Sequence, residues 1–356
     1  MPLRSAGSVN QGFSTGNGAP APVRRARHAV LWLLLLSSLV LLACAAWLYA
    51  SFRVEIAAQY ARIATGSRLV ATGCGPVEVA EAGAGQPLLL VHGTGGGFDQ
   101  AMLESGGFVD RGLRVIAPSR FGYLRTPFPQ DASAEAQADQ FVCLLDALGV
   151  ERTAIIGISA GANSAMQFAI RHPQRVSALV LLVPAVYKPS DMAASVAMKS
   201  PLAEKALMTI VGSDFPFWFI AHFVPETAVR MVLATPPEAL ARASADERQR
   251  AERLLTSILP ISARAKGMLN DAHIAGNPPR YALESIRTPT LVMSVRDDLF
   301  GTYASAQYTA QHISGARFVG FERGGHVWVG HEAEVLDQTA EFVRGAAAPD
   351  GSGSRR

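Results

Sequence analysis

The sequence predicts an α/β protein: a mostly parallel sheet flanked by helices and interrupted by a helical insert. Short continuous apolar runs, such as 87–91 and 176–183, are typical of strands buried on both faces of a parallel sheet. Segment 134–148 instead has apolar residues spaced three and four apart, which indicates an amphipathic helix. Strands that alternate with helices are the pattern of an α/β fold.

The alternation begins near Ser67 and pauses between 184 and 281, where the pattern is mainly helical and broken by prolines. The expected strands are, in order, 67–72, 76–82, 87–91, 113–117, the run that begins at Thr153, 176–183, 289–295 and 316–321. A last helix is expected from about 332 to 343. The sequence therefore predicts a core of 67–183 and 282–345, a helical cap over 184–281, and a disordered tail over 346–356.

A long apolar segment precedes this domain. Residues 29–50 contain no charged side chain, and at the helical rise they extend about 33 Å, enough to cross a bilayer. Arginines at 24, 25 and 27 come before the segment, so the positive-inside rule places the N-terminus in the cytoplasm. We expect a disordered tail over 1–28, a transmembrane signal-anchor over 29–50, and a catalytic domain on the opposite, extracytoplasmic side.

Three other interpretations of the apolar segment remain open. A cleaved signal peptide has a similar composition, although its apolar region is usually shorter. The residues that end at Cys44 resemble a lipoprotein cleavage box, but the apolar run continues beyond that cysteine. A helix buried in the protein core is the third alternative.

Composition narrows the function classes. The 356 residues are 49% apolar and 17% charged, with a net charge of +3 that is evenly spread and does not indicate nucleic-acid binding. The cysteines Cys44, Cys74 and Cys143 form no C-x-x-C motif, and no cluster of histidine and cysteine has the spacing of metal ligands. We therefore expect no metal and no organic cofactor.

The central feature is the stretch 153–161, TAIIGISAG, which predicts a strand, a very tight turn and a helix. The turn places Ser159 between Gly157 and Gly161. Glycines are needed there because a turn that exposes a serine brings the strand and helix backbones too close for a Cβ atom. We interpret Ser159 as a catalytic nucleophile.

A neutral serine needs a base, and a histidine base needs a carboxylate that orients it and stabilises its cation. His326 lies in a glycine-rich loop after the last expected strand. Asp297 and Asp298 directly follow the strand before it, and Asp191 is a less favoured alternative acid. The carboxyl ends of parallel strands meet at one edge of a sheet, so these groups are expected together.

Acyl transfer also needs two backbone N–H groups that bind an oxyanion. Ala160 follows the nucleophile at the start of a helix and is expected to supply one of them. The loop 92–97, HGTGGG, follows an earlier strand, and its Thr94 is expected to supply the other. His92 in the same loop is expected to support its structure.

Across 67–345 the sequence resembles the α/β-hydrolase superfamily, through the motifs HGTGGG, GISAG, VRDDLF and GGH. The single-lid branch of esterases, lipases and meta-cleavage-product hydrolases is the most similar. Alignment on the family's pattern favours Asp298 over Asp297 as the acid. The turn after strand 113–117 departs from the pattern, because Tyr123 and the two residues after it replace its usual small polar end.

The resemblance implies a serine hydrolase, of carboxylesterase or lipase type, acting on a small-molecule carboxylic ester. The apolar cap and anchor favour an apolar acyl group, as in monoacylglycerols or lysophospholipids, with Phe217 and Trp218 as expected pocket residues. A C–C bond hydrolase that uses the same triad is one alternative. A hydrolase-fold binding module with an idle triad is the other.

Overall fold

The computed structural model describes residues 21–189, 209 and 212–347. Most of the two expected tails and part of the expected cap lie outside these residues. The chain divides into two compact units, Met1–Val54 and Glu55–Arg356, which are described separately.

The first unit contains most of helix α1, which runs from Ala21 to Ala64 without a break. The helix includes the expected span 29–50 and is longer at both ends. Alanine and arginine, which favour helix, flank the span, and the last turns of the helix pack in the second unit. Within the described residues this is the one helix with the length and apolarity to cross a membrane. Its most apolar window has a mean hydropathy of 2.6 and no buried residue. A signal sequence near an N-terminus has the same properties.

The second unit is built on an eight-stranded sheet with the order β1-β2-β4-β3-β5-β6-β7-β8. Strand β2 is antiparallel to both its neighbours, and all other pairs are parallel. The strands are β1 (Arg68–Val70), β2 (Val77–Ala82), β3 (Gln86–Val91), β4 (Leu113–Pro118), β5 (Thr153–Ile158), β6 (Val176–Leu182), β7 (Thr290–Val295) and β8 (Arg317–Phe321). The parallel sheet predicted from the apolar runs is confirmed.

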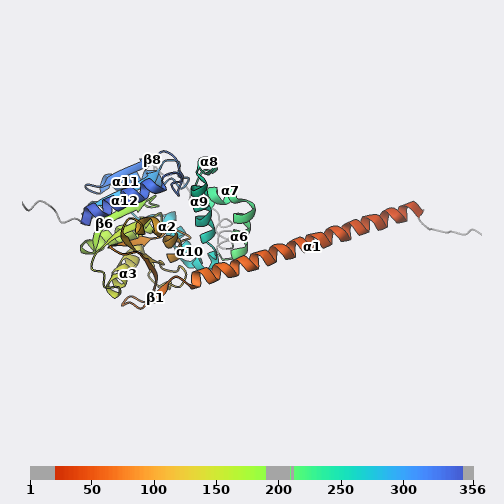
Figure 1. Cartoon of the computed structure of the whole chain (residues 1–356), viewed down its shortest axis with the longest axis horizontal. Helices are drawn as coiled ribbons and strands as arrows, with labels where there is room; N and C mark the ends of the chain where they lie inside the picture. Colours follow the sequence, from red (N-terminus) through yellow and green to blue (C-terminus); the bar gives the residue numbers. More distant parts are fainter. Residues whose placement is uncertain (1–20, 190–208, 210–211, 348–356) are drawn as a thin grey trace, which may run out of the picture. The chain divides into compact units, whose positions relative to one another are not determined.

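Helices cover both faces of the sheet, as Figure 1 shows. One apolar core contains side chains of α3 (Ala134–Ala147), α4 (Gly161–Arg171) and α11 (Thr302–His312), and the other contains side chains of α2 (Phe98–Val109) and α12 (Glu332–Ala347). Successive residues of β3 alternate between the cores: Leu89 and Val91 face the first, Leu88 and Leu90 the second. This burial on both faces is why the strand sequence is continuously apolar.

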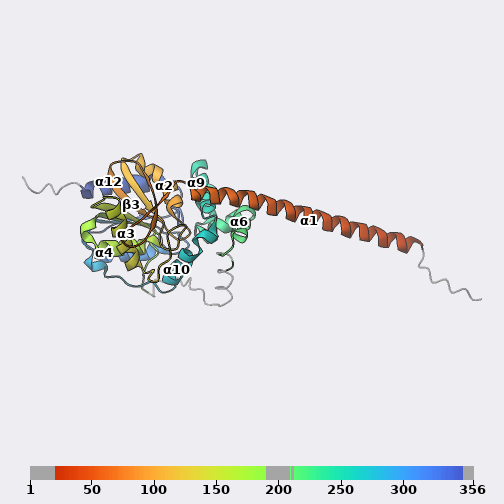
Figure 2. The same cartoon turned by 90° about the horizontal axis from the view of Figure 1, so that it is seen from below.

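Between β6 and β7 the chain forms a group of helices beside the sheet (Figures 1 and 2). The described ones are α6 (Asp214–Phe223), α7 (Pro225–Val232), α8 (Pro237–Arg242), α9 (Ala245–Ser257), a 3-10 turn (Ile261–Arg264) and α10 (Ala265–Gly276). The insert thus has the helical character that the sequence predicts, and residues 190–208 and 210–211 of it are not described.

A disulfide joins Cys74 to Cys143, with their Cα atoms 5.9 Å apart, and ties the turn between β1 and β2 to α3. The sequence spacing gave no indication of this pairing, because the two cysteines meet only through the tertiary fold. Cys44 is free and exposed.

Candidate active site

Ser159 occupies the sharp turn between β5 and α4. Its φ is +51°, a left-handed conformation that is unfavourable for a residue with a Cβ atom. A Cβ at Gly157 would lie 2.7 Å from the Cα of Ala162, and one at Gly161 would lie 2.5 Å from the carbonyl oxygen of His92. The flanking glycines therefore permit the close approach that the sequence pattern predicts. Ser159 retains 8% exposure, so its hydroxyl is not sealed in the core.

His326 and Asp298 are joined by a hydrogen bond. The Nδ1 atom of His326 donates to Oδ2 of Asp298 over 2.8 Å, which leaves Nε2 as the ring nitrogen free to act as base. The Asp298 carboxylate also accepts from the Thr302 hydroxyl and, at 2.8 Å, from the backbone N–H of Phe300. Burial alone raises the pKa of Asp298, but the charge of His326 and these donors outweigh it and hold the pKa below its usual value. The carboxylate is therefore ionised and fixed in place.

The neighbouring acid has different contacts. Asp297 accepts a 2.8 Å hydrogen bond from the backbone N–H of Gly325, just before the histidine, and so fixes the loop rather than the imidazole. The structure therefore brings Asp298, and not Asp297, to His326. The weaker alternative Asp191 lies outside the described residues.

The loop 92–97 passes directly beside the nucleophile. A Cβ at Gly93 would lie 3.1 Å from the Cβ of Ser159. Among the described residues, neither the Thr94 nor the Ala160 backbone N–H donates a hydrogen bond. An oxyanion hole requires such free N–H groups, and the assignment of these two to it stays a prediction.

A buried carboxylate of the insert holds this loop. Asp271 in α10 accepts from both guanidinium nitrogens of Arg120, at 2.8 and 2.6 Å, and from the hydroxyls of Tyr123 and Thr94, at 2.5 and 2.9 Å. Burial raises the pKa of Asp271, but Arg120 and the hydroxyls outweigh it and keep the group ionised. The unusual Tyr123 thus has a structural role. Sequence reasoning missed Asp271, and no local motif marks it.

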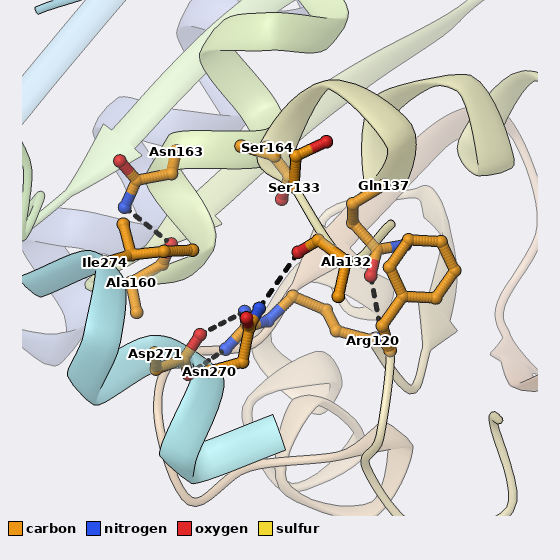
Figure 3. Close-up of a pocket in the computed structure, with 12 residues that line it drawn as sticks. Arg120, Ala132, Ser133, Gln137, Ala160, Asn163, Ser164, Asn270, Asp271 and Ile274 are labelled. Atoms are coloured by element: carbon orange, nitrogen blue, oxygen red, sulfur yellow. Dashed lines mark hydrogen bonds and ion pairs between the residues drawn. The ribbon is translucent and has the colours of Figure 1, made fainter. Parts of the chain in front are cut away.

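Figure 3 shows the Asp271 carboxylate directly against the guanidinium of Arg120, at a pocket that Ala160 also lines. The pocket lining is largely polar and includes Asn163 and Asn270. Neither Ser159 nor His326 lines it, so we do not assign it as the acyl pocket.

His92 is buried and serves the same loop. Its Nε2 accepts the backbone N–H of Arg120 at 3.0 Å, and its Nδ1 lies 2.7 Å from the Gly93 carbonyl oxygen. Burial and the nearby Arg120 charge lower its pKa to about 3, so the ring is neutral near pH 7. These contacts agree with the expected supporting role.

The expected pocket residues Phe217 and Trp218 are buried in α6. The indole N–H of Trp218 donates over 2.8 Å to Glu55, a residue of α1. A role in substrate binding stays a prediction for both.

Among the described residues, Ser159 Oγ makes no hydrogen bond, and His326 Nε2 makes none. Such contacts are commonly long in free enzymes and tighten when substrate binds. No group of three or more histidine, cysteine, aspartate or glutamate side chains in the described part of the chain is placed to hold a metal ion.

The family model of the α/β hydrolase fold matches residues 86–329. The chain belongs to the α/β hydrolase fold family. It is 28% identical over 276 residues to the uncharacterized hydrolase YcgS of Bacillus subtilis (strain 168), a match that covers 73% of this chain and 91% of that protein. It is 37% identical over 110 residues to a 2-hydroxymuconate semialdehyde hydrolase of Pseudomonas sp. (strain CF600), covering 29% of this chain and 38% of that protein.

Solved structures show the same fold. An α/β hydrolase fold protein from Nakamurella multipartita superposes with a TM-score of 0.63 at 29% identity, covering 78% of this chain and 99% of that chain. An esterase from Exiguobacterium antarcticum superposes with a TM-score of 0.61 at 18% identity, covering 78% of this chain and 98% of that chain. The chain is thus an α/β-fold hydrolase, and at 18% identity the second likeness shows the fold alone.

The two adjacent acids allow a direct test. Asp298→Asn should lower kcat for an ester substrate roughly 10³- to 10⁴-fold, because an amide cannot hold the required tautomer of His326 or stabilise its cation. Asp297→Asn keeps an oxygen acceptor for the Gly325 N–H, so its loss should stay below about tenfold. Steady-state kinetics on the two purified variants give the comparison. Equal losses, or a larger loss at Asp297, would contradict the assignment.

Proposed function

We propose that this α/β hydrolase cleaves a carboxylic ester through an acyl-enzyme on Ser159. The observation that supports it most strongly is the hydrogen bond from His326 to Asp298. Strands β5, β7 and β8 run in one direction, so the loops after them emerge at the same sheet edge as Ser159. A nucleophile, a base and an orienting acid at one edge are the parts that acyl transfer needs.

In the first half-reaction, Nε2 of His326 takes the proton of the Ser159 hydroxyl as its oxygen attacks the acyl carbon. The carbonyl oxygen becomes an oxyanion, which accepts hydrogen bonds from the backbone N–H groups of Thr94 and Ala160. Asp298 stabilises the imidazolium. His326 then gives its proton to the alcohol oxygen, the C–O bond breaks, and the alcohol leaves.

In the second half-reaction, water replaces the alcohol. His326 takes a proton from the water, whose oxygen attacks the acyl carbon, and the same two N–H groups bind the new oxyanion. The bond to Ser159 Oγ breaks as His326 returns a proton to it, and the carboxylic acid leaves. Apart from this water, the proposed chemistry uses side chains and backbone groups of this chain.

An apolar acyl substrate, of the monoacylglycerol or lysophospholipid type, fits the setting of the site best. Helix α6 of the insert is rich in aromatic residues, with Phe217 and Trp218 buried and Phe219 and Phe223 partly exposed. The apolar part of α1 would keep the enzyme where such substrates collect.

A second candidate is a C–C bond hydrolase of the meta-cleavage-product type. The observation that favours it is the 37% identity to a 2-hydroxymuconate semialdehyde hydrolase, although that match covers 29% of this chain. The same serine, histidine and aspartate would act in both reactions.

A substrate panel separates the two functions. Purified full-length protein in detergent should hydrolyse medium- and long-chain aryl and glycerol esters much faster than a ring-cleavage dienone. Ser159→Ala should lower ester turnover by several orders of magnitude, because no other group at the site replaces the nucleophile. Faster turnover of the dienone would favour the C–C hydrolase. Ester turnover by the alanine variant close to that of the wild type would refute the nucleophile.

We also propose that α1 is a single-pass anchor, with its N-terminus in the cytoplasm and the catalytic domain on the other side. The arginines before the span support this orientation. The disulfide between Cys74 and Cys143 also supports it, because disulfides persist in oxidising compartments outside the cytoplasm.

Fractionation tests the anchor. The full-length chain should stay in membranes washed with carbonate, and protease added to the extracytoplasmic side should degrade the catalytic domain. An untreated lysate should yield no shortened, freely soluble form. A soluble mature chain would show a cleaved signal peptide, and protection from the protease would reverse the orientation.

A further inference from the structure

The last turns of α1, residues 55–64, are part of the second unit and bind the helical insert. Glu55 accepts the indole N–H of Trp218 and lies 3.0 Å from Nε2 of His222. The hydroxyl of Tyr60 lies 3.2 Å from Asp214 and 3.0 Å from the Ser262 hydroxyl. The second compact unit therefore includes these last turns of α1 as well as the strand pattern that starts near Ser67.

Arg62 makes the most consequential of these contacts. Its guanidinium donates to Asp99 Oδ2 at 2.5 Å and to the carbonyl oxygens of Ser257 and Leu259 at 3.1 and 2.8 Å. These carbonyls stand at the C-terminal end of α9, where helix geometry leaves acceptors unpaired and concentrates partial negative charge. Arg62 thus joins three segments: α1, the first turn of α2, and the end of α9.

Arg264 completes the same cluster and is fully buried. It donates to both carboxylate oxygens of Asp99, at 3.1 and 2.7 Å, and to the carbonyl oxygens of Ser257 and Ile258, at 2.8 and 2.9 Å. Its remaining contact, at 2.6 Å, is the carbonyl oxygen of Gly96. Burial raises the pKa of Asp99, but Arg264 and Arg62 outweigh it and keep the carboxylate charged.

Gly96 lies two residues after Thr94, in the loop that supplies the proposed oxyanion donor. We propose that Arg62 is a positioning residue for this loop, which it holds through Asp99 and Arg264. The proposal rests on the proposed acyl transfer. Oxyanion donors are effective only when they are held in place before the reaction, so a looser loop weakens binding of the transition state more than binding of the substrate.

Loss of Arg62 should loosen the loop without unfolding it. Asp271 holds Thr94 through a separate set of contacts that involve no residue of α1. Arg264 keeps its own bonds to Asp99 and Gly96. The expected defect is therefore a change in position and mobility of the loop in a folded protein.

The test compares Arg62→Gln and Arg62→Lys with Arg53→Gln, in full-length protein. Arg53 is exposed on the same helix, and its hydrogen bond goes to Tyr49, so it controls for loss of one positive charge from α1. Arg62→Gln should lower kcat for an ester about tenfold with KM within about twofold. A trifluoromethyl ketone forms an adduct with serine that carries an oxyanion. The affinity of Arg62→Gln for this ketone should fall by the same factor as its kcat/KM. Arg62→Lys should restore part of both the affinity and kcat/KM.

Amide hydrogen exchange supplies a readout that does not depend on activity. In Arg62→Gln the peptide covering 92–97 should exchange several times faster than in the wild type, while Arg53→Gln should match the wild type. Unchanged exchange and kinetics in Arg62→Gln would overturn the positioning role. So would a loss of activity that is fully explained by the fraction of unfolded protein, as measured in a thermal melt. A wild type that neither hydrolyses esters nor binds the ketone would instead refute the proposed function, and the exchange data would still decide whether Arg62 holds the loop.

Discussion

The backbone turn at Ser159 is the constraint on which the rest of the site depends. A positive φ at a serine costs on the order of 1 kcal/mol, and here the surrounding structure fixes it. The N–H of Ser159 donates to Leu182 of β6 at 2.9 Å, and its carbonyl oxygen accepts from Ala185 at 3.1 Å. Because the serine stands at the end of a central strand, the groups proposed to act with it lie in the loops after the parallel strands β3, β5, β7 and β8.

The loop 92–97 shows how the insert contributes to this arrangement. Two buried carboxylates, each paired with arginine, hold the loop at different residues: Asp271 binds Thr94 directly, and Asp99 binds Arg264, which donates to Gly96. A buried ion pair adds little net stability. Separating or removing one partner leaves an uncompensated buried charge, so the two partners stay together. In the proposed role of Arg62, the end of α1 and the insert together support this loop.

Local sequence predicted the sheet and the elbow because both follow from short-range rules: apolar runs for buried strands, and glycines where backbones approach. It could not choose between Asp297 and Asp298 without the family pattern, since both follow the same strand and only the turn decides which one meets His326. The contacts of Asp271 and the disulfide join segments far apart in the chain and carry no local signature. The strand pattern starts near Ser67, so it did not indicate that the last turns of the preceding helix pack in the second unit.

Trapping the acyl-enzyme would test directly whether Ser159 is the nucleophile. Full-length protein would be mixed with an ester of a slowly released acid, quenched in acid within milliseconds to seconds, digested, and measured by mass spectrometry. We expect the peptide containing Ser159 to gain the mass of the acyl group and to lose it at the rate of turnover. Steady hydrolysis without an acylated Ser159, or with the acyl group on another residue, would contradict this assignment.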